Sequence, residues 1–250
     1  AIWGQGCSSP TPPVHVAWLA EARRMGGVRA RRRAPSARRA KSEHHLHSAG
    51  TLGLALLLLS EVNASAPVLA FGDSLTAGGM GSVPYPEQLS WRLQVPVETA
   101  GVWGETTASM LRRLAEHLGR NASRPSGPWV FLLLGGTNDL ASEPLERTLA
   151  NLCAMHAMAA AHGAAVGVLE VPVFTHRRLL GAPQRRRELL NAALRRRQAR
   201  YPFPSFVARL SRVPAELLYD GIHFTTEGYA AFADVVLDAL RRFHLARRRL

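Results

Sequence analysis

From residue 67 onward, short runs of apolar residues alternate with longer stretches in which apolar positions recur every three to four residues. Residues 129–134 (WVFLLL) are apolar without interruption, which is typical of a central strand that is buried on both faces of a parallel sheet. Residues 106–118 instead carry their apolar side chains at helical spacing. Alternation of this kind predicts an α/β fold in which helices cover both faces of a parallel sheet.

The same pattern gives approximate positions for all the expected elements. Strands are expected at residues 68–71, 95–99, 129–134, 165–171 and 205–210. Helices are expected at residues 84–94, 106–118, 145–162, 183–199 and 227–243. We therefore predict a three-layer α/β/α sandwich that spans residues 67–250.

The first 66 residues do not follow this pattern. Residues 1–50 have no sustained helical or strand period, and such a segment buries too little apolar surface to offset its chain entropy. We interpret residues 1–66 as a disordered basic extension. Within it, residues 51–60 (TLGLALLLLS) form an apolar run of signal-peptide length, followed by the small-residue pattern Ala64-x-Ala66. Segment 51–66 is thus a candidate targeting segment, which would make the protein secreted or organellar; without it the protein would be cytoplasmic.

The chain is strongly basic, and the charge is unevenly distributed. Its formal net charge is +13, and only Lys41 among the 31 basic residues is a lysine. Residues 1–66 hold nine Arg or Lys and three Asp or Glu, a net charge of +6. A basic balance is one mark of nucleic-acid binding. However, the chain lacks a recognition motif and aromatic residues among its arginines, so no nucleic-acid partner is expected.

Residues 183–199 are predicted to form an Arg-rich amphipathic helix. Its basic face is either simply solvated or attracted to anionic lipid head groups, which would give peripheral contact with an anionic membrane. We expect the protein to be a monomer.

Polar segments follow the first three predicted strands, and a fourth precedes the last helix. These segments are residues 72–74, 101–106, 135–139 and 220–223. In open α/β sheets, ligands bind outside the carboxyl ends of the strands. The four segments are therefore expected to meet at one edge of the sheet.

The residue types in these segments fit nucleophilic catalysis by a serine. Ser74 lies at a strand-to-helix turn, and a serine hydroxyl becomes an effective nucleophile when a base takes its proton. His223 is the candidate base, and Asp220 three residues earlier is the candidate partner that orients the imidazole. The candidate oxyanion donors are the backbone N–H groups of Ser74 and Gly104 and the side-chain amide of Asn138.

Taken together, these segments resemble the sequence blocks of the SGNH, or GDSL, hydrolase family. The stretches FGDSLTAG (71–78), AGVWGET (100–106), LGGTND (134–139) and DGIHF (220–224) are similar to its first, second, third and fifth blocks. The resemblance covers residues 68–240. Thr99 stands where the second block usually has an asparagine, so we expect altered anchoring of that loop rather than loss of activity.

The resemblance implies a flavodoxin-like fold and hydrolysis of carboxylic esters or thioesters through an acyl-enzyme on Ser74, with Asp220 and His223 completing the triad. It implies that the substrate is a small-molecule acyl ester or a lipid, and it implies no metal and no organic cofactor. The alternatives on the same fold are a carbohydrate O-acetyl esterase and an acyltransferase. Outside the enzymes, a basic nucleic-acid-binding protein and a catalytically inactive relative remain, although all four blocks carry the expected residues.

Three residues beside the candidate site are open to more than one interpretation. Asp73 and Asp139 adjoin the proposed catalytic residues, and we expect them to cap helices or hold loops rather than act on substrate. Trp103 either lines the acyl pocket or packs the loop that contains Gly104.

Overall fold

The computed structural model describes residues 67–79, 81–120 and 129–247. Within these ranges, five strands form a single sheet in which every neighbouring pair is parallel. The strands are β1 (Val68–Gly72), β2 (Val97–Gly101), β3 (Trp129–Leu134), β4 (Ala164–Leu169) and β5 (Ser205–Ala208), in the spatial order β2-β1-β3-β4-β5. The predicted extension and targeting segment at residues 1–66 lie outside the described residues.

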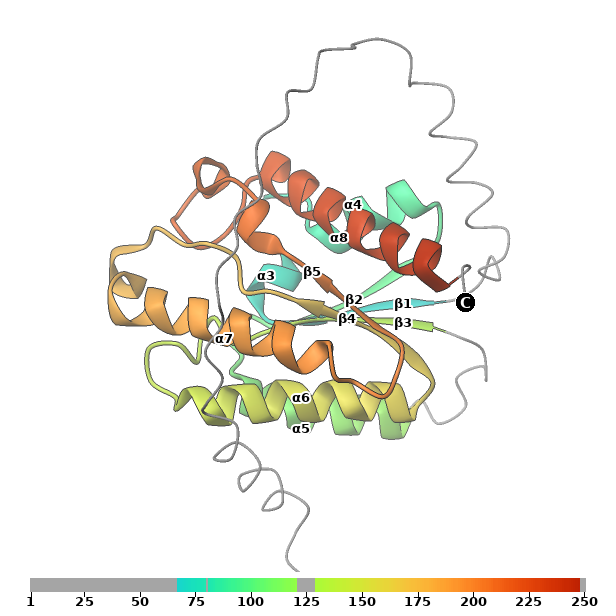
Figure 1. Cartoon of the computed structure of the whole chain (residues 1–250). Helices are drawn as coiled ribbons and strands as arrows, with labels where there is room; N and C mark the ends of the chain where they lie inside the picture. Colours follow the sequence, from blue (N-terminus) through green and yellow to red (C-terminus); the bar gives the residue numbers. More distant parts are fainter. Residues whose placement is uncertain (1–66, 80, 121–128, 248–250) are drawn as a thin grey trace, which may run out of the picture. The chain divides into compact units, whose positions relative to one another are not determined.

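Helices cover both faces of the sheet (Figure 1). One face carries α4 (Tyr85–Leu93) and α8 (Thr226–Arg247), and the other carries α5 (Thr107–Arg120), α6 (Leu145–Ala161) and α7 (Ala182–Gln198). A four-residue helix, α3 (Ser74–Ala77), follows β1, and three short 3₁₀ turns cover Arg177–Leu179, Leu210–Arg212 and Ala215–Leu217. The three-layer α/β/α sandwich expected from the sequence is confirmed.

The sheet divides the apolar core into two layers. Side chains of consecutive strand residues point to opposite faces, so Leu132 packs with the α4–α8 layer and Leu133 with the α5–α7 layer. All five residues of β1 and all six of β3 are buried, as expected for central strands. The stacked rings of Tyr85 and Phe232, with centroids 4.2 Å apart, join α4 to α8.

Some element boundaries differ from those predicted. The second strand begins at Val97 rather than at residue 95, because Val95 and Pro96 form the turn after α4, where Ser90 Oγ donates to the Val95 carbonyl (2.8 Å). The last strand ends at Ala208, because the chain turns into a 3₁₀ helix at Leu210. Among the described helices, none is both long and apolar enough to cross a membrane.

Candidate active site

The segments expected to meet are placed at the carboxyl edge of the sheet. Ser74 follows β1, Gly104 follows β2 and Asn138 follows β3. β1 lies between β2 and β3 in the sheet, so the turn that bears Ser74 lies between the other two loops. The fourth segment, residues 220–223, reaches this edge from the loop that precedes α8.

The turn that presents Ser74 depends on its two preceding residues. Gly72 has no room for a side chain, because a Cβ there would lie 2.2 Å from Thr76 Oγ1 and 2.5 Å from the Leu134 carbonyl oxygen. Asp73 is the N-cap of α3, and its Oδ1 accepts a hydrogen bond from the Leu75 N–H (3.0 Å). Ser74 is thereby the first residue of a helix, a position whose N–H has no partner inside the helix.

A chain of hydrogen bonds joins Ser74, His223 and Asp220. The distance from Ser74 Oγ to His223 Nε2 is 2.9 Å, and that from His223 Nδ1 to Asp220 Oδ2 is 2.7 Å. When the Nδ1 proton is donated to the carboxylate, Nε2 is left as an acceptor for the serine hydroxyl. The residues proposed as nucleophile, base and orienting acid are therefore in contact, although 149 and 146 positions separate Ser74 from His223 and Asp220.

Asp220 is held in its charged form. Partial burial would raise its pKa, but hydrogen bonds from the backbone and ring of His223 and from the Ile222 N–H lower the pKa below its ordinary value. The two backbone donors lie 2.7 Å and 2.9 Å from Asp220 Oδ1. A carboxylate that accepts several hydrogen bonds is stabilised as the anion. Asp220 is therefore ionised beside His223.

The loop that carries Asp220 and His223 is fixed to the segment after β4. The Gly221 carbonyl accepts hydrogen bonds from the N–H groups of Thr175 (2.8 Å) and His176 (3.0 Å). Gly221 has a φ of +83°, and a Cβ there would lie 2.7 Å from the His176 nitrogen. Only glycine fits this close approach of two backbones.

The two further oxyanion candidates lie on adjoining loops. Gly104 has a φ of +70°, and a Cβ there would meet nothing within 4 Å. Its conformation therefore favours glycine, and the space beside it is open. Asn138 is partly buried, and its Nδ2 donates to the Glu105 carbonyl (2.9 Å). An amide nitrogen carries two hydrogens, so one remains for a substrate oxygen.

Sequence reasoning missed Arg113, which ties three parts of the site together. From α5 it donates to the carbonyl oxygens of Gly72 (3.0 Å) and Ala100 (3.1 Å) and to both carboxylate oxygens of Glu105. Its guanidinium also lies 3.9 Å from the centre of the Phe71 ring. Arg113 thus links the ends of β1 and β2 to the loop that contains Gly104. No local motif marks it, because its partners lie 8 to 41 positions away.

Two exposed aromatic side chains lie close to the His223 imidazole. The ring of Trp103 lies 4.9 Å from that of His223, and the ring of Tyr219 lies 6.0 Å from it. Both side chains are about half exposed, at 51% and 45%. Trp103 therefore does not fill the interior of its loop, and it forms part of the molecular surface next to His223.

The acidic residues beside the site hold structure, as expected. Asp73 caps α3, and Asp139 accepts hydrogen bonds from the backbone N–H and the hydroxyl of Thr107 at the start of α5. Burial, together with the charges of Asp139 and Glu105, raises the pKa of Asp73 to about 7. No group of three or more His, Cys, Asp or Glu side chains that could hold a metal ion occurs within residues 67–79, 81–120 and 129–247.

The sequence matches the family model described as GDSL-like lipase/acylhydrolase over residues 70–231. This match covers more than half of the chain and all four segments of the site. The chain belongs to the GDSL-like lipase/acylhydrolase family, and it is an ester hydrolase of that class. No curated protein sequence matches the chain.

Solved structures share the fold at low sequence identity. A GDSL-like lipase from Bacteroides thetaiotaomicron is 20% identical, with a TM-score of 0.58 over 77% of this chain and 96% of its own. The lipase/acylhydrolase from Enterococcus faecalis is 23% identical, with a TM-score of 0.58 over 70% of this chain and 96% of its own. A carbohydrate acetylesterase from Sinorhizobium meliloti is 17% identical, with a TM-score of 0.60 over 71% of this chain and 99% of its own.

Proposed function

We propose that the protein hydrolyses carboxylic esters through an acyl-enzyme on Ser74, with His223 as general base and Asp220 as the group that orients it. The observation that carries this proposal is the hydrogen-bonded chain from Ser74 Oγ to His223 Nε2 (2.9 Å) and from His223 Nδ1 to Asp220 Oδ2 (2.7 Å). A serine, a base and an orienting acid in this order form the minimal device for acyl transfer.

The first half of the reaction forms the acyl-enzyme. Ser74 Oγ attacks the acyl carbonyl carbon as its proton passes to His223 Nε2, and Asp220 stabilises the resulting imidazolium. The carbonyl oxygen becomes an oxyanion that accepts hydrogen bonds from the N–H groups of Ser74 and Gly104 and from the second N–H of Asn138 Nδ2. When this intermediate collapses, the bond to the leaving oxygen breaks, and that oxygen takes the proton from His223.

The second half of the reaction releases the acid. Water gives a proton to His223 Nε2 and attacks the acyl carbon, and the same donors stabilise the second oxyanion. Collapse then breaks the bond between the acyl carbon and Ser74 Oγ, which recovers its proton from His223. A thioester would follow the same route, with a thiol as the leaving group.

A carbohydrate O-acetyl esterase is the second candidate function. The observation that favours it is the pair of half-exposed rings, Trp103 and Tyr219, close to the His223 imidazole. Aromatic side chains with an apolar body suit the faces of ring-shaped ligands as well as acyl chains. The fold likeness to the acetylesterase from Sinorhizobium meliloti is consistent with either function.

A panel of esters with a shared detection method separates these candidates. kcat/KM would be measured on p-nitrophenyl acetate, butyrate and palmitate, on an acyl thioester, on a lysophospholipid and on an acetylated oligosaccharide. A preference for the long-chain substrates supports a lipid esterase, and a preference for the acetylated oligosaccharide supports the second candidate. Absence of hydrolysis across the whole panel would contradict the proposal.

An acyltransferase on the same triad gives a different product. Adding alcohols at increasing concentration to the ester assay would divert the acyl group from water to the alcohol. Hydrolysis requires that free acid remains the main product at millimolar alcohol. A dominant transfer product would reassign the acceptor without changing the role of Ser74.

A further inference from the structure

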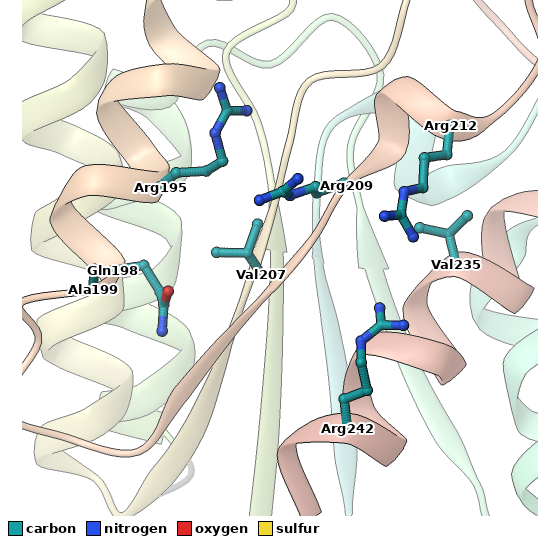
Figure 2. A pocket seen from close by; sticks show the side chains of 8 residues that line it. All are labelled: Arg195, Gln198, Ala199, Val207, Arg209, Arg212, Val235 and Arg242. Atoms are coloured by element: carbon teal, nitrogen blue, oxygen red, sulfur yellow. The ribbon is translucent and has the colours of Figure 1, made fainter. Parts of the chain in front are cut away.

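A basic pocket lies away from the triad, along the edge of the sheet formed by β5. Its volume is about 520 Å³. It is lined by residues of the last turns of α7, of β5 and the 3₁₀ turn after it, and of α8, which are Arg195, Gln198, Ala199, Val207, Arg209, Arg212, Val235 and Arg242. We call this the arginine pocket (Figure 2).

Four arginines from three elements line this pocket: Arg195 on α7, Arg209 and Arg212 at the 3₁₀ turn after β5, and Arg242 on α8. Figure 2 shows Arg209 between Arg195 on α7 and Arg212, with the side chain of Arg242 on α8 pointing toward Arg212. If the arginines only formed a solvated basic face, they would all lie on one helix. Here they come from three elements and line the same pocket. The Arg-rich segment 183–199 contributes one of them, Arg195, to this convergence.

Only two of these four charges are neutralised by carboxylates in the described part of the chain. Arg195 pairs with the fully buried Glu170, which also accepts from Ser211 Oγ (3.3 Å). Arg242 pairs with Asp238 one helical turn earlier, and both side chains of that pair are more than half exposed.

Arg209 and Arg212 make no ion pair or side-chain hydrogen bond with any described residue. Both are exposed in a pocket that already holds two other guanidinium groups. Placing unpaired like charges together is unfavourable. An anion that bound between them would relieve this repulsion.

The charge balance indicates what kind of anion fits. Four guanidinium groups against the two carboxylates leave a net charge of +2 at the pocket. A phosphate monoester carries a charge of about −1.5 to −2 at pH 7. The planar guanidinium group donates two parallel hydrogen bonds to phosphate oxygens. Val207 and Val235 offer a small apolar contact to the group that bears the phosphate.

The pocket is separate from the proposed catalytic site at the carboxyl edge of the sheet, which we call the catalytic rim. No residue of the triad or of the oxyanion candidates lines it. β5 lies three strands from β1 in the sheet order, which corresponds to about 14 Å across parallel strands. A ligand in the pocket is therefore not the ester under attack at Ser74.

We propose that the arginine pocket binds a phosphate monoester, with Arg209 and Arg212 as the principal contacts. The phosphate group belongs either to a soluble metabolite or to a lipid head group, and both present the same dianion. This site goes beyond ester hydrolysis and does not depend on the catalytic role of Ser74.

Titration calorimetry on the full chain tests the proposal. Glycerol 3-phosphate and inorganic phosphate serve as dianionic probes, and glycerophosphocholine, a phosphodiester without net charge, serves as the matched weak binder. Binding of the two dianions is expected, with at least about tenfold weaker binding of the diester because one charge-assisted contact is lost. The affinity is expected to fall with added salt and on lowering the pH from 8 to 5.5, because the second phosphate pKa is about 6.

Two double variants separate the pocket from general electrostatics. Arg209→Gln with Arg212→Gln is expected to weaken binding of glycerol 3-phosphate by about tenfold or more. Arg185→Gln with Arg186→Gln removes the same charge from the other end of α7, about 15 Å from Arg195 along the helix, and is expected to change binding less than twofold. Esterase activity is expected to be unchanged in both variants.

Vesicles distinguish the two sources of the phosphate. Sedimentation with vesicles of phosphatidic acid in phosphatidylcholine, compared with phosphatidylcholine alone, reports binding of a lipid monoester. Loss of sedimentation in the pocket variant but not in the control variant identifies a lipid head group. Pocket-dependent binding of glycerol 3-phosphate without pocket-dependent sedimentation identifies a soluble phosphate.

Three outcomes would overturn the proposal. One is the absence of calorimetric binding of both dianions, together with no vesicle sedimentation that depends on Arg209 and Arg212. Another is equal loss of binding in the pocket variant and in the control variant. The third is tighter binding of a random oligonucleotide than of any monoester, with the same dependence on both variants, which would indicate a general polyanion surface.

Discussion

Arginine has opposite roles in two regions of this molecule. At the catalytic rim, Arg113 donates to two strand-end carbonyls and to Glu105, and its plane covers the Phe71 ring. At the β5 edge, Arg209 and Arg212 are exposed and have no carboxylate partner among the described residues. The same side chain is a fixed support in the first region, and in the second it is a donor without a partner among the described residues.

This difference indicates how the two sites are used. The donors of Arg113 are already satisfied, so it positions backbone without contacting substrate. The guanidinium groups of Arg209 and Arg212 line a cavity and have no carboxylate partner among the described residues, so they are available to an external anion. Partner geometry, and not the count of basic residues, distinguishes a structural arginine from a binding arginine in this arginine-rich protein.

Replacing Ser74 is expected to have the largest effect, and this effect is confined to the catalytic rim. Ser74→Ala is expected to lower kcat for a p-nitrophenyl ester by about 10⁴-fold or more, because no other group is placed to form the acyl-enzyme. Phosphate binding at the arginine pocket is expected to be unchanged, which also shows that the variant is folded. An enzyme that kept its wild-type rate would remove Ser74 from the mechanism.

Removal of one oxyanion donor has a smaller effect on the same region. Asn138→Ala is expected to lower kcat by about 10²–10³-fold and to raise KM less, because the lost hydrogen bond strengthens as the oxyanion forms. Steady-state kinetics measure the two constants separately. Asn151→Ala is the matched control, since its amide donates to Thr107 Oγ1 on α5 (3.1 Å), and a few-fold change is expected there. A rise in KM alone would assign Asn138 to ground-state binding.

The support provided by Arg113 is tested by a variant that keeps its apolar stem. Arg113→Met retains packing on Phe71 but loses every donor, so the Gly104 loop and the Ser74 turn are no longer joined. We expect kcat to fall by about 10–100-fold with a smaller change in KM, as for a displaced catalytic group. Arg112→Met removes an exposed neighbour and is expected to have no effect. Equal behaviour of the two variants would make Arg113 a surface charge without a role at the rim.

The pH dependence of stability reports on the buried carboxyl beside the nucleophile. Burial raises the pKa of Asp73 to about 7 from its ordinary 3.8, so the folded protein holds a proton that the unfolded chain releases. Between pH 4 and 7 the unfolded state binds fewer protons, and the free energy of unfolding therefore falls as pH rises. From pH 5 to 7, Asp73 is expected to account for a loss of about 2 kcal/mol.

Urea unfolding of wild type and Asp73→Asn across this pH range isolates that contribution. Asparagine mimics the protonated acid and keeps an oxygen for the Leu75 N–H, so the variant is expected to lose less stability between pH 5 and 7. Parallel pH profiles for the two proteins would place the pKa of Asp73 near its ordinary value.

The sequence predicted the fold well because its signals are local. The apolar run of β3 and the helical spacing of α5 need no knowledge of distant partners. The boundaries of β2 and β5 were displaced because they depend on turns that the apolar pattern does not show. Ser90 Oγ binds the Val95 carbonyl before β2, and backbone hydrogen bonds of a 3₁₀ turn follow β5. Ser74, His223 and Asp220 were found because they lie in blocks that follow a known order.

The supports of the site could not be predicted in the same way. Arg113, and the backbone of Thr175 and His176 that holds Gly221, act across long sequence separations without a motif. The arginine pocket was visible only in part, because residues 183–199 suggested one basic face while the other contributing arginines come from separate elements. Three-dimensional convergence is the information that a single sequence lacks.

The central claim is that Ser74 is the nucleophile and that His223 activates it. Incubation with a fluorophosphonate, followed by peptide mass spectrometry, reads this directly, because the reagent forms a stable adduct with an activated serine. One adduct on Ser74 is expected in the wild type, and labelling is expected to be strongly slowed in His223→Ala. A label on a different residue, or labelling of Ser74 at the same rate without His223, would contradict the account.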